Sequence, residues 1–150
     1  MAKRYLEDLE VGEKWTSEPF VITEQEIIEF GLRFDPQPFH TDPVAAVNSP
    51  FGSLVASGWH LAALCMRRSV EARLFGDIPV VGAGVDELRW LQPVRPNEVL
   101  VVERELVEII TLPDKPKRGL AKARMELKNQ KGEVVMRMYG LTSIPKRPVA

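Results

Sequence analysis

The hydrophobic and polar positions change their period along the chain, and each period predicts a different kind of element. From residue 51 to residue 75, "FGSLVASGWHLAALCMRRSVEARLF", apolar and small residues occupy every side of a helical wheel until Arg67. A helix that is apolar all round is typical of a buried helix. We therefore expect a long central helix over about residues 53–75, ending before Gly76.

After residue 78 the pattern takes a period of two, which is the period of β-strands. Apolar and charged residues alternate in "LAKARMELK", residues 120–128, and "EVVMRMYGLTS", residues 133–143, repeats the period. Earlier stretches on both sides of a turn at residues 95–97 also read as strands. A first strand precedes the helix in "EKWTSEPFVI", where Pro19 favours a sheet edge. One buried helix followed by an antiparallel meander predicts an α+β hot-dog fold, a five-stranded antiparallel sheet wrapped around the helix.

Two shorter helices are expected between the first strand and the central helix. Thr23 and Glu26 form a capping-box pattern, and the helix that they open should end before Pro36. "HTDPVAAV" predicts another short helix, with Thr41 or Asp42 as its cap and Pro43 at the first helical position.

Composition and charge exclude several classes of function. The 150 residues suit a single domain, residues 1–150, and a formal net charge of −1 provides no basic field for binding nucleic acid. The single cysteine, Cys65, excludes an intramolecular disulfide, and no apolar run reaches the ~18 residues of a membrane span. The amino-terminal stretch does not resemble a signal peptide, so a cytoplasmic location without membrane contact is expected.

The stretch "FDPQPFH", residues 34–40, presents a carboxylate and one of only two histidines on a segment with two prolines. The prolines predict a rigid, kinked loop instead of a helix. For an arbitrary pair, Asp35 as a turn former and His40 bonded to nearby backbone would be the simpler interpretation. His60, within the apolar helix, is interpreted as a core residue, and two histidines at unrelated spacing predict no metal site.

The sequence that follows favours a chemical role for Asp35 and His40. "SPFGSLVASG" brings Gly52 and Gly58 to the start of the central helix, where small residues let a ligand approach the backbone. Amides at a helix N-terminus have no intrahelical partner and can stabilise a developing oxyanion. A carboxylate, an imidazole and an amide donor together suit proton transfer beside an activated carbonyl.

These residues resemble a known family. "FDPQPFHTDPVAA" is similar to the hydratase-2 motif of the MaoC-like dehydratases and (R)-specific enoyl-CoA hydratases, with matches at Asp35, Pro38, His40 and Ala46. "FGSLVASG" resembles the family's Phe-x-x-x-Ile-Ala-His-Gly, which opens its central helix. The resemblance covers the whole chain in element order and agrees with the hot-dog fold predicted from the pattern.

The resemblance implies a hydro-lyase of fatty acid metabolism that acts on a trans-2-enoyl or (R)-3-hydroxyacyl thioester. Asp35 and His40 would hold a water beside the 2,3-bond, and the Gly58 amide would bind the thioester oxygen. Coenzyme A would be the substrate's carrier and not a bound cofactor; whether an acyl carrier protein replaces it stays open. The family also implies a homodimer, or a higher homo-oligomer, with the acyl chain in a tunnel between subunits.

Several residues depart from the family pattern. Gln37 replaces the usual Asn, Phe34 replaces a glycine, and Ser57 replaces the histidine before the helix glycine. Bulky side chains in and beside the motif imply a reshaped acyl pocket. The residues expected to contact substrate are Phe39, Phe51, Gly52, Ser57 and Trp59.

Two other functions share the fold. One is an acyl-CoA-binding module without turnover, and the other is thioester hydrolysis. A pure binder has no need of both Asp35 and His40, which favours the hydro-lyase. A group of basic residues is interpreted as a solvated face, with coenzyme A phosphate binding as the alternative: Lys115, Lys117, Arg118, Lys122, Arg124 and Lys128.

Overall fold

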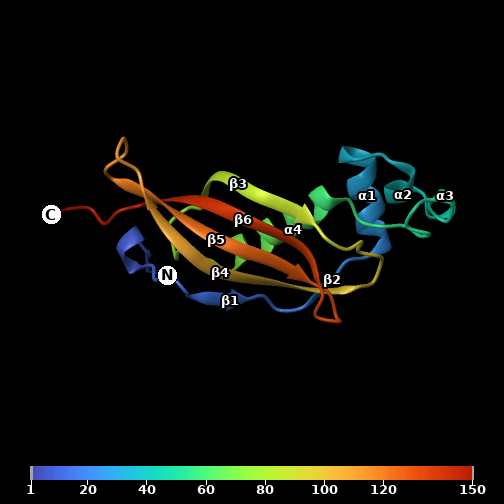
Figure 1. The fold of residues 1–150 in the computed structure, drawn as a ribbon, viewed down its shortest axis with the longest axis horizontal. Coiled ribbons are helices and arrows are strands. Elements are labelled where there is room, and N and C mark those ends of the chain that lie inside the picture. Colours follow the sequence, from blue (N-terminus) through green and yellow to red (C-terminus); the bar gives the residue numbers. More distant parts are fainter. Residues whose placement is uncertain (1, 150) are drawn as a thin grey trace.

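The computed structural model describes residues 2–149, which form one antiparallel sheet, a central helix and a group of short helices at one end (Figure 1). In chain order the elements are η1 (Leu6–Asp8), β1 (Lys14–Thr16), β2 (Phe20–Val21), α1 (Glu24–Phe34), α2 (Pro38–Thr41), α3 (Pro43–Ala46), α4 (Gly58–Glu71), β3 (Val81–Trp90), β4 (Val99–Thr111), β5 (Arg118–Lys128) and β6 (Val134–Pro145).

The sheet has the order β1-β4-β5-β6-β3, with every described pair antiparallel and with β2 added beside β4. The hot-dog prediction is confirmed, since α4 packs against one face of this sheet, behind β5 and β6 in Figure 1. The expected single first strand is two short strands, so the described sheet has six strands where five were predicted. Pro19 lies between β1 and β2, where its missing amide donor interrupts the ladder with β4.

The core lies between α4 and the inward face of the sheet. β5 shows the predicted alternation, since its apolar residues Ala121, Ala123, Met125 and Leu127 are buried. They pack with side chains of β4, β6 and α4 in two hydrophobic clusters. Burial of this apolar surface is the main favourable term in folding.

The central helix is shorter than predicted. It spans Gly58–Glu71, whereas helix was expected over about residues 53–75. The segment before it is not helical, and its amides pair with distant carbonyls: Val55 donates to the Phe39 carbonyl and Ala56 to the Val94 carbonyl. After the helix, Arg73 and Gly76 both have positive φ, which ends regular structure.

Only one face of α4 packs on the sheet. The expectation of a helix buried on all sides is therefore wrong for the single chain, because Trp59, Met66 and Val70 are 59%, 48% and 46% exposed. These residues recur at spacings of seven and four, which places them on one side of the helix. An apolar face remains uncovered in one copy of the chain.

The short helices begin and end largely as predicted. The capping box of Thr23 and Glu26 opens α1, and Asp42 caps α3 with Pro43 at its first position. The prediction that residues 34–40 contain no helix is wrong in its second half, because α2 begins at Pro38 and contains His40. Proline is compatible with this first helical position, where its missing amide would have had no partner.

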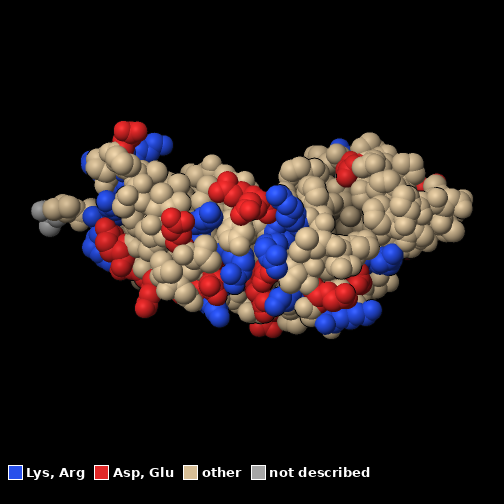
Figure 2. All heavy atoms as spheres, viewed as in Figure 1, with Lys and Arg blue, Asp and Glu red and all other residues tan. Residues whose placement is uncertain are grey.

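The outer face of the sheet carries charges of both signs, interspersed along the strands (Figure 2). Three of the basic residues considered above are paired there: Lys122 with Asp86, Arg124 with Glu105, and Lys128 with Glu103. This pairing is what the solvated-face interpretation predicts. Among the helices of residues 2–149, none has the length and apolar character needed to cross a membrane.

Candidate active site

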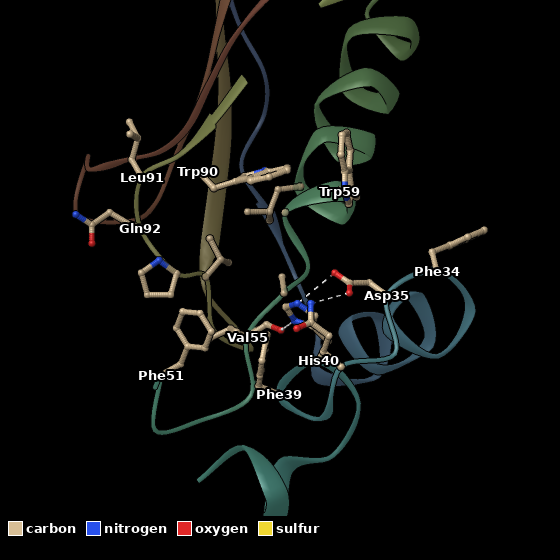
Figure 3. A pocket seen from close by; sticks show the side chains of 16 residues that line it. Phe34, Asp35, Phe39, His40, Phe51, Val55, Trp59, Trp90, Leu91 and Gln92 are labelled. Carbon is tan, nitrogen blue, oxygen red and sulfur yellow. Dashed lines mark hydrogen bonds and ion pairs between the residues drawn. The ribbon is translucent and has the colours of Figure 1, made fainter. Parts of the chain in front are cut away.

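Asp35 and His40 come together because α1 and α2 meet at a sharp corner. Asp35 is the C-cap of α1, and its amide donates to the Gly31 carbonyl. Gly31 lets the two helices approach, since a Cβ on it would lie 2.6 Å from the His40 carbonyl oxygen. One turn later, α2 directs the His40 side chain back toward Asp35 (Figure 3).

The two side chains are in direct contact. His40 Nε2 lies 3.3 Å from Asp35 Oδ2, and the side chains are 7% and 21% exposed. On its other side, His40 Nδ1 lies 2.7 Å from the Val55 carbonyl oxygen. A carbonyl oxygen only accepts, so Nδ1 must carry the hydrogen in this bond. Nδ1 is thereby engaged with the backbone, and Nε2 is the ring nitrogen that faces the carboxylate.

Two further side chains hold Asp35. The Ser57 hydroxyl donates to Asp35 Oδ2 at 2.7 Å, and Gln37 Nε2 donates to Oδ1 at 3.0 Å. Burial acts to raise the pKa of Asp35, but these two hydrogen bonds, together with the positive charge of His40 when that ring is protonated, outweigh it, so the pKa lies below its ordinary value. Asp35 is thus held ionised and fixed in orientation.

The start of α4 borders the same site. Ser57 is the N-cap and Gly58 the first residue of the helix, where backbone amides have no intrahelical acceptor. A Cβ on Gly58 would lie 2.2 Å from Trp90 Cε2, so the indole packs directly on the glycine. Trp90 reaches this position from the end of β3, after a register irregularity between Asp86 and Arg89. Such irregularities re-aim the side chains that follow them.

A cavity of about 610 Å³ opens beside these groups. Asp35, His40 and Gly58 all line it, and aromatic rings form much of its remaining wall: Phe34, Phe39, Phe51, Trp59 and Trp90. Arg95 holds the rim in place, since its guanidinium donates to the Ser53 hydroxyl and the Phe51 carbonyl. The cavity combines a polar corner with an apolar body, as ligand sites generally do.

The structure brings together most of the predicted site residues. Of the five expected substrate contacts, Phe39, Phe51 and Trp59 line the cavity. Gly52 does not line it and lies in an exposed turn with a φ of +70°, so its small size serves the turn. Ser57 is fully buried and bonded to Asp35, which makes it a support for the carboxylate and not part of the cavity wall.

Sequence reasoning missed the wall contributed by residues 90–94. They comprise the last residue of β3 and the four residues after it, more than thirty positions beyond the start of α4, and all five line the cavity. Nothing in the local pattern distinguishes Trp90 from an ordinary strand residue. Within residues 2–149, His, Cys, Asp and Glu side chains form no group of three or more with the arrangement of metal ligands.

Comparison with known proteins gives consistent results. A family model described as a MaoC like domain matches residues 8–128. The protein YdeM of Bacillus subtilis is 27% identical over 130 residues, which cover 84% of this chain and 88% of the relative. These similarities span the Asp35–His40 corner, the start of α4 and much of the sheet.

Solved structures agree along nearly the whole chain. The MaoC-like dehydratase of Rhodospirillum rubrum is 40% identical, with a TM-score of 0.89 over 97% of this chain and 99% of that chain. The (R)-hydratase PhaJ1 of Pseudomonas aeruginosa is 26% identical, with a TM-score of 0.71 over 99% of this chain and 92% of that chain. The arrangement of helix and sheet is therefore shared from end to end.

Proposed function

Because the chain belongs to the MaoC-like dehydratase family, we propose that it is a hydro-lyase acting at the 2,3-bond of an acyl thioester. The observation that supports this most strongly is the Asp35–His40 contact, with Ser57 and Gln37 bonded to the carboxylate. A purely structural ion pair needs no access to a cavity, yet both side chains line the 610 Å³ cavity. The substrate that we propose is a trans-2-enoyl thioester or its (R)-3-hydroxyacyl product.

The arrangement of the two side chains suggests how a water is held. The Asp35 carboxylate and Nε2 of His40 face each other at 3.3 Å, and in the reactive form that we propose Nε2 carries no hydrogen, so both groups accept. A water that donates one hydrogen to each would join them, with its oxygen free to attack C3. The hydroxyl then adds at C3 while the pair takes the water's proton, and a proton from the pair completes the addition at C2. Dehydration follows the same steps in reverse.

The N-terminus of α4 would stabilise the charge that develops during the reaction. When water adds at C3, the electrons of the double bond move toward the thioester carbonyl, whose oxygen becomes enolate-like. We propose that the Gly58 amide donates to this oxygen, since Gly58 lines the cavity at the first turn of the helix. Removing one such donor in a dry site typically costs about 10²–10³-fold in rate.

The aromatic wall would set the size of the acyl group. Trp59 and Trp90 meet edge to face with ring centroids 5.2 Å apart, and Phe39 and Phe51 pack in the same way at 5.2 Å. These four rings surround the space next to Asp35 and His40 (Figure 3). We expect them to favour compact acyl groups near the reacting bond over unrestricted straight chains.

We also propose that the protein works as a homodimer joined along β3. This strand is at an edge of the sheet, and it exposes Val81 and Val85, which are 48% and 50% exposed. The uncovered apolar face of α4 lies next to this edge, since Met66 and Val85 line one cavity and Trp59 packs against Trp90. An unpaired strand edge beside an exposed apolar face favours association with a second copy. Light scattering at micromolar concentration should give the mass of a dimer.

The test is a panel of trans-2-enoyl thioesters assayed in two ways. Loss of the enoyl absorbance reports hydration, and a thiol reagent reports release of the free carrier. We expect the first signal with an (R)-3-hydroxyacyl product and no thiol release. Thiol release from saturated thioesters would indicate a thioesterase, and tight binding without either signal would indicate a binding module. Either of these results would contradict the proposal.

A further inference from the structure

A buried arginine interrupts the apolar face of β4. The inward positions of this strand are Leu100, Val102, Arg104 and Leu106, and Arg104 is 8% exposed. Among residues 2–149, no other Lys, Arg, Asp or Glu side chain is buried to this degree. The alternation of the strand would place an aliphatic residue at this position, so its charge needs an explanation.

Arg104 has no anionic partner among the described residues. Its guanidinium packs over the Phe75 ring at 5.4 Å from the centroid. Glu13 contributes to its electrostatic environment, but the Glu13 carboxylate accepts hydrogen bonds from Arg4 at 3.1 Å and 3.3 Å. Burial lowers the pKa of Arg104. A buried charge is normally paired, because removing it from water is costly without compensation.

Arg104 lines a second cavity, of about 280 Å³, beneath the C-terminal half of α4. It shares no lining residue with the cavity at Asp35 and His40. The wall is mostly apolar, and its larger side chains include Met66, Leu74, Phe75, Val80, Met125 and Met138. Met66 and Val85 are 48% and 50% exposed, so the cavity reaches the surface beside β3.

Three glycines keep this cavity open. Gly82, Gly84 and Gly140 line it, and none of them has a positive φ. A Cβ on Gly82 would meet nothing within 4 Å, and on Gly84 or Gly140 it would meet only one side-chain atom, at 3.9 Å or 3.8 Å. Neither backbone conformation nor steric conflict requires glycine at these positions. Larger residues would fill the space that Arg104 faces.

We propose that this cavity binds a carboxylate with a short apolar body, whose charged group pairs with Arg104. The fork of a guanidinium matches the two oxygens of a carboxylate. Met, Leu, Val and Phe side chains around it suit an aliphatic chain better than a phosphate, which has no apolar part. The small volume limits the ligand to a short one, since the pockets that bind drug-sized ligands measure roughly 300–1,000 Å³.

Such a carboxylate has two possible sources. One is a free organic acid. The other, which rests on the proposed function and dimer, is the far end of a substrate's acyl chain. β3 runs from this cavity at Gly82 to the active-site cavity at Trp90. When two copies pair antiparallel along β3, the Trp90 end of one lies beside the Gly82 end of the other. The active site of one subunit would then adjoin this cavity of its partner.

The binding arm of the test uses hexanoate, with hexanamide as the uncharged match, titrated into the whole protein and followed by NMR shifts of the methionine methyl groups. Hexanoate should bind the wild type at least tenfold more tightly than hexanamide. This preference should disappear in Arg104→Met and remain in Arg124→Met, a control on the outer face of β5. Gly140→Val, which keeps Arg104 and fills the cavity, should also abolish binding.

The kinetic arm compares an enoyl-CoA that ends in a carboxylate with one of equal length that ends in a methyl group. If the acyl chain is the source, Arg104→Met should lower kcat/KM at least tenfold for the first substrate and leave the second unchanged. Hexanoate binding without this kinetic effect would assign the site to a free acid. Two results together overturn the proposal. In the binding arm, hexanoate binds no more tightly than hexanamide, or neither binds. In the kinetic arm, Arg104→Met leaves the ratio of kcat/KM for the two enoyl-CoA substrates unchanged. The binding arm needs no turnover, so it separates this failure from failure of the proposed hydro-lyase.

Discussion

Ser57→Ala tests whether the hydroxyl under Asp35 contributes to the reaction. Ser57 is fully buried, and its hydroxyl donates to the Asp35 carboxylate at 2.7 Å. A hydrogen bond to a charged group contributes about 1.5–3 kcal/mol. If the transition state depends on the position and charge of Asp35, losing this bond should lower kcat about 10- to 150-fold, at roughly tenfold per 1.4 kcal/mol.

Ser57→Ala should also shift the pH dependence of kcat/KM. Ser57 is one of the two hydrogen-bond donors that hold the pKa of Asp35 below its ordinary value. Removing it raises that pKa, so the acid limb of the kcat/KM profile should move to higher pH in Ser57→Ala. The assay is enoyl hydration measured across pH, with the variant's molar mass in solution and unfolding temperature recorded alongside.

Ser17→Ala is the matched control, because Ser17 is also a buried serine whose hydroxyl is bonded, in this case to the Val102 amide and the Glu18 carbonyl. It lies outside the cavity and should lose stability without losing rate. If Ser57→Ala keeps its wild-type rate and acid limb, the hydrogen bond is structural only, and the reasoning on Asp35 is refuted.

Three further predictions follow from the same geometry. Gly58→Ala should lower the free energy of unfolding by about 1–3 kcal/mol, because the added Cβ conflicts with Trp90. Trp90→Ala in the same chain should relieve that loss. Equal stability of Gly58→Ala and wild type in urea would contradict this. Burial raises the pKa of the Cys65 thiol to about 12, so thiol reagents should label it only after unfolding. Rapid labelling of the native protein would contradict the burial of this side chain. Burial lowers the pKa of His60, so the unfolded chain binds more protons than the folded one, and the free energy of unfolding should fall as pH drops below about 6.5. His60→Gln should show a weaker dependence of stability on pH. Identical stability–pH profiles of the variant and the wild type would contradict the role of His60.

The strand pattern predicted most of the fold because side-chain alternation and turn residues are both properties of the local sequence. Alternation in β5 fixes which side chains face α4, and the proline and glycine turns fix where strands end. The limits of α4 were not predicted, because residues 54–57 are as apolar as the helix itself. Their non-helical form depends on backbone hydrogen bonds to Phe39 and Val94, which are distant in sequence.

In the candidate site, too, the residues within local motifs were predicted and those placed by distant packing were not. Asp35, His40 and Gly58 could be predicted because they lie within two short motifs that the sequence presents intact. Trp90 could not, since only the packing of β3 against the start of α4 brings its ring onto Gly58. Arg104 was also missed, although its signal was present: it is the charged residue at an inward position of an otherwise apolar alternation.

The most direct test of the central claim is the hydration rate of Asp35→Asn, His40→Gln and the double variant. Each is measured on the best enoyl thioester while the fold and the molar mass in solution are checked. If the pair holds one water and acts as a unit, each single change should cost about 10²–10⁴-fold. The double variant should be little slower than either single variant. Near-normal rates in both folded single variants would contradict the account, and so would losses that multiply in the double variant.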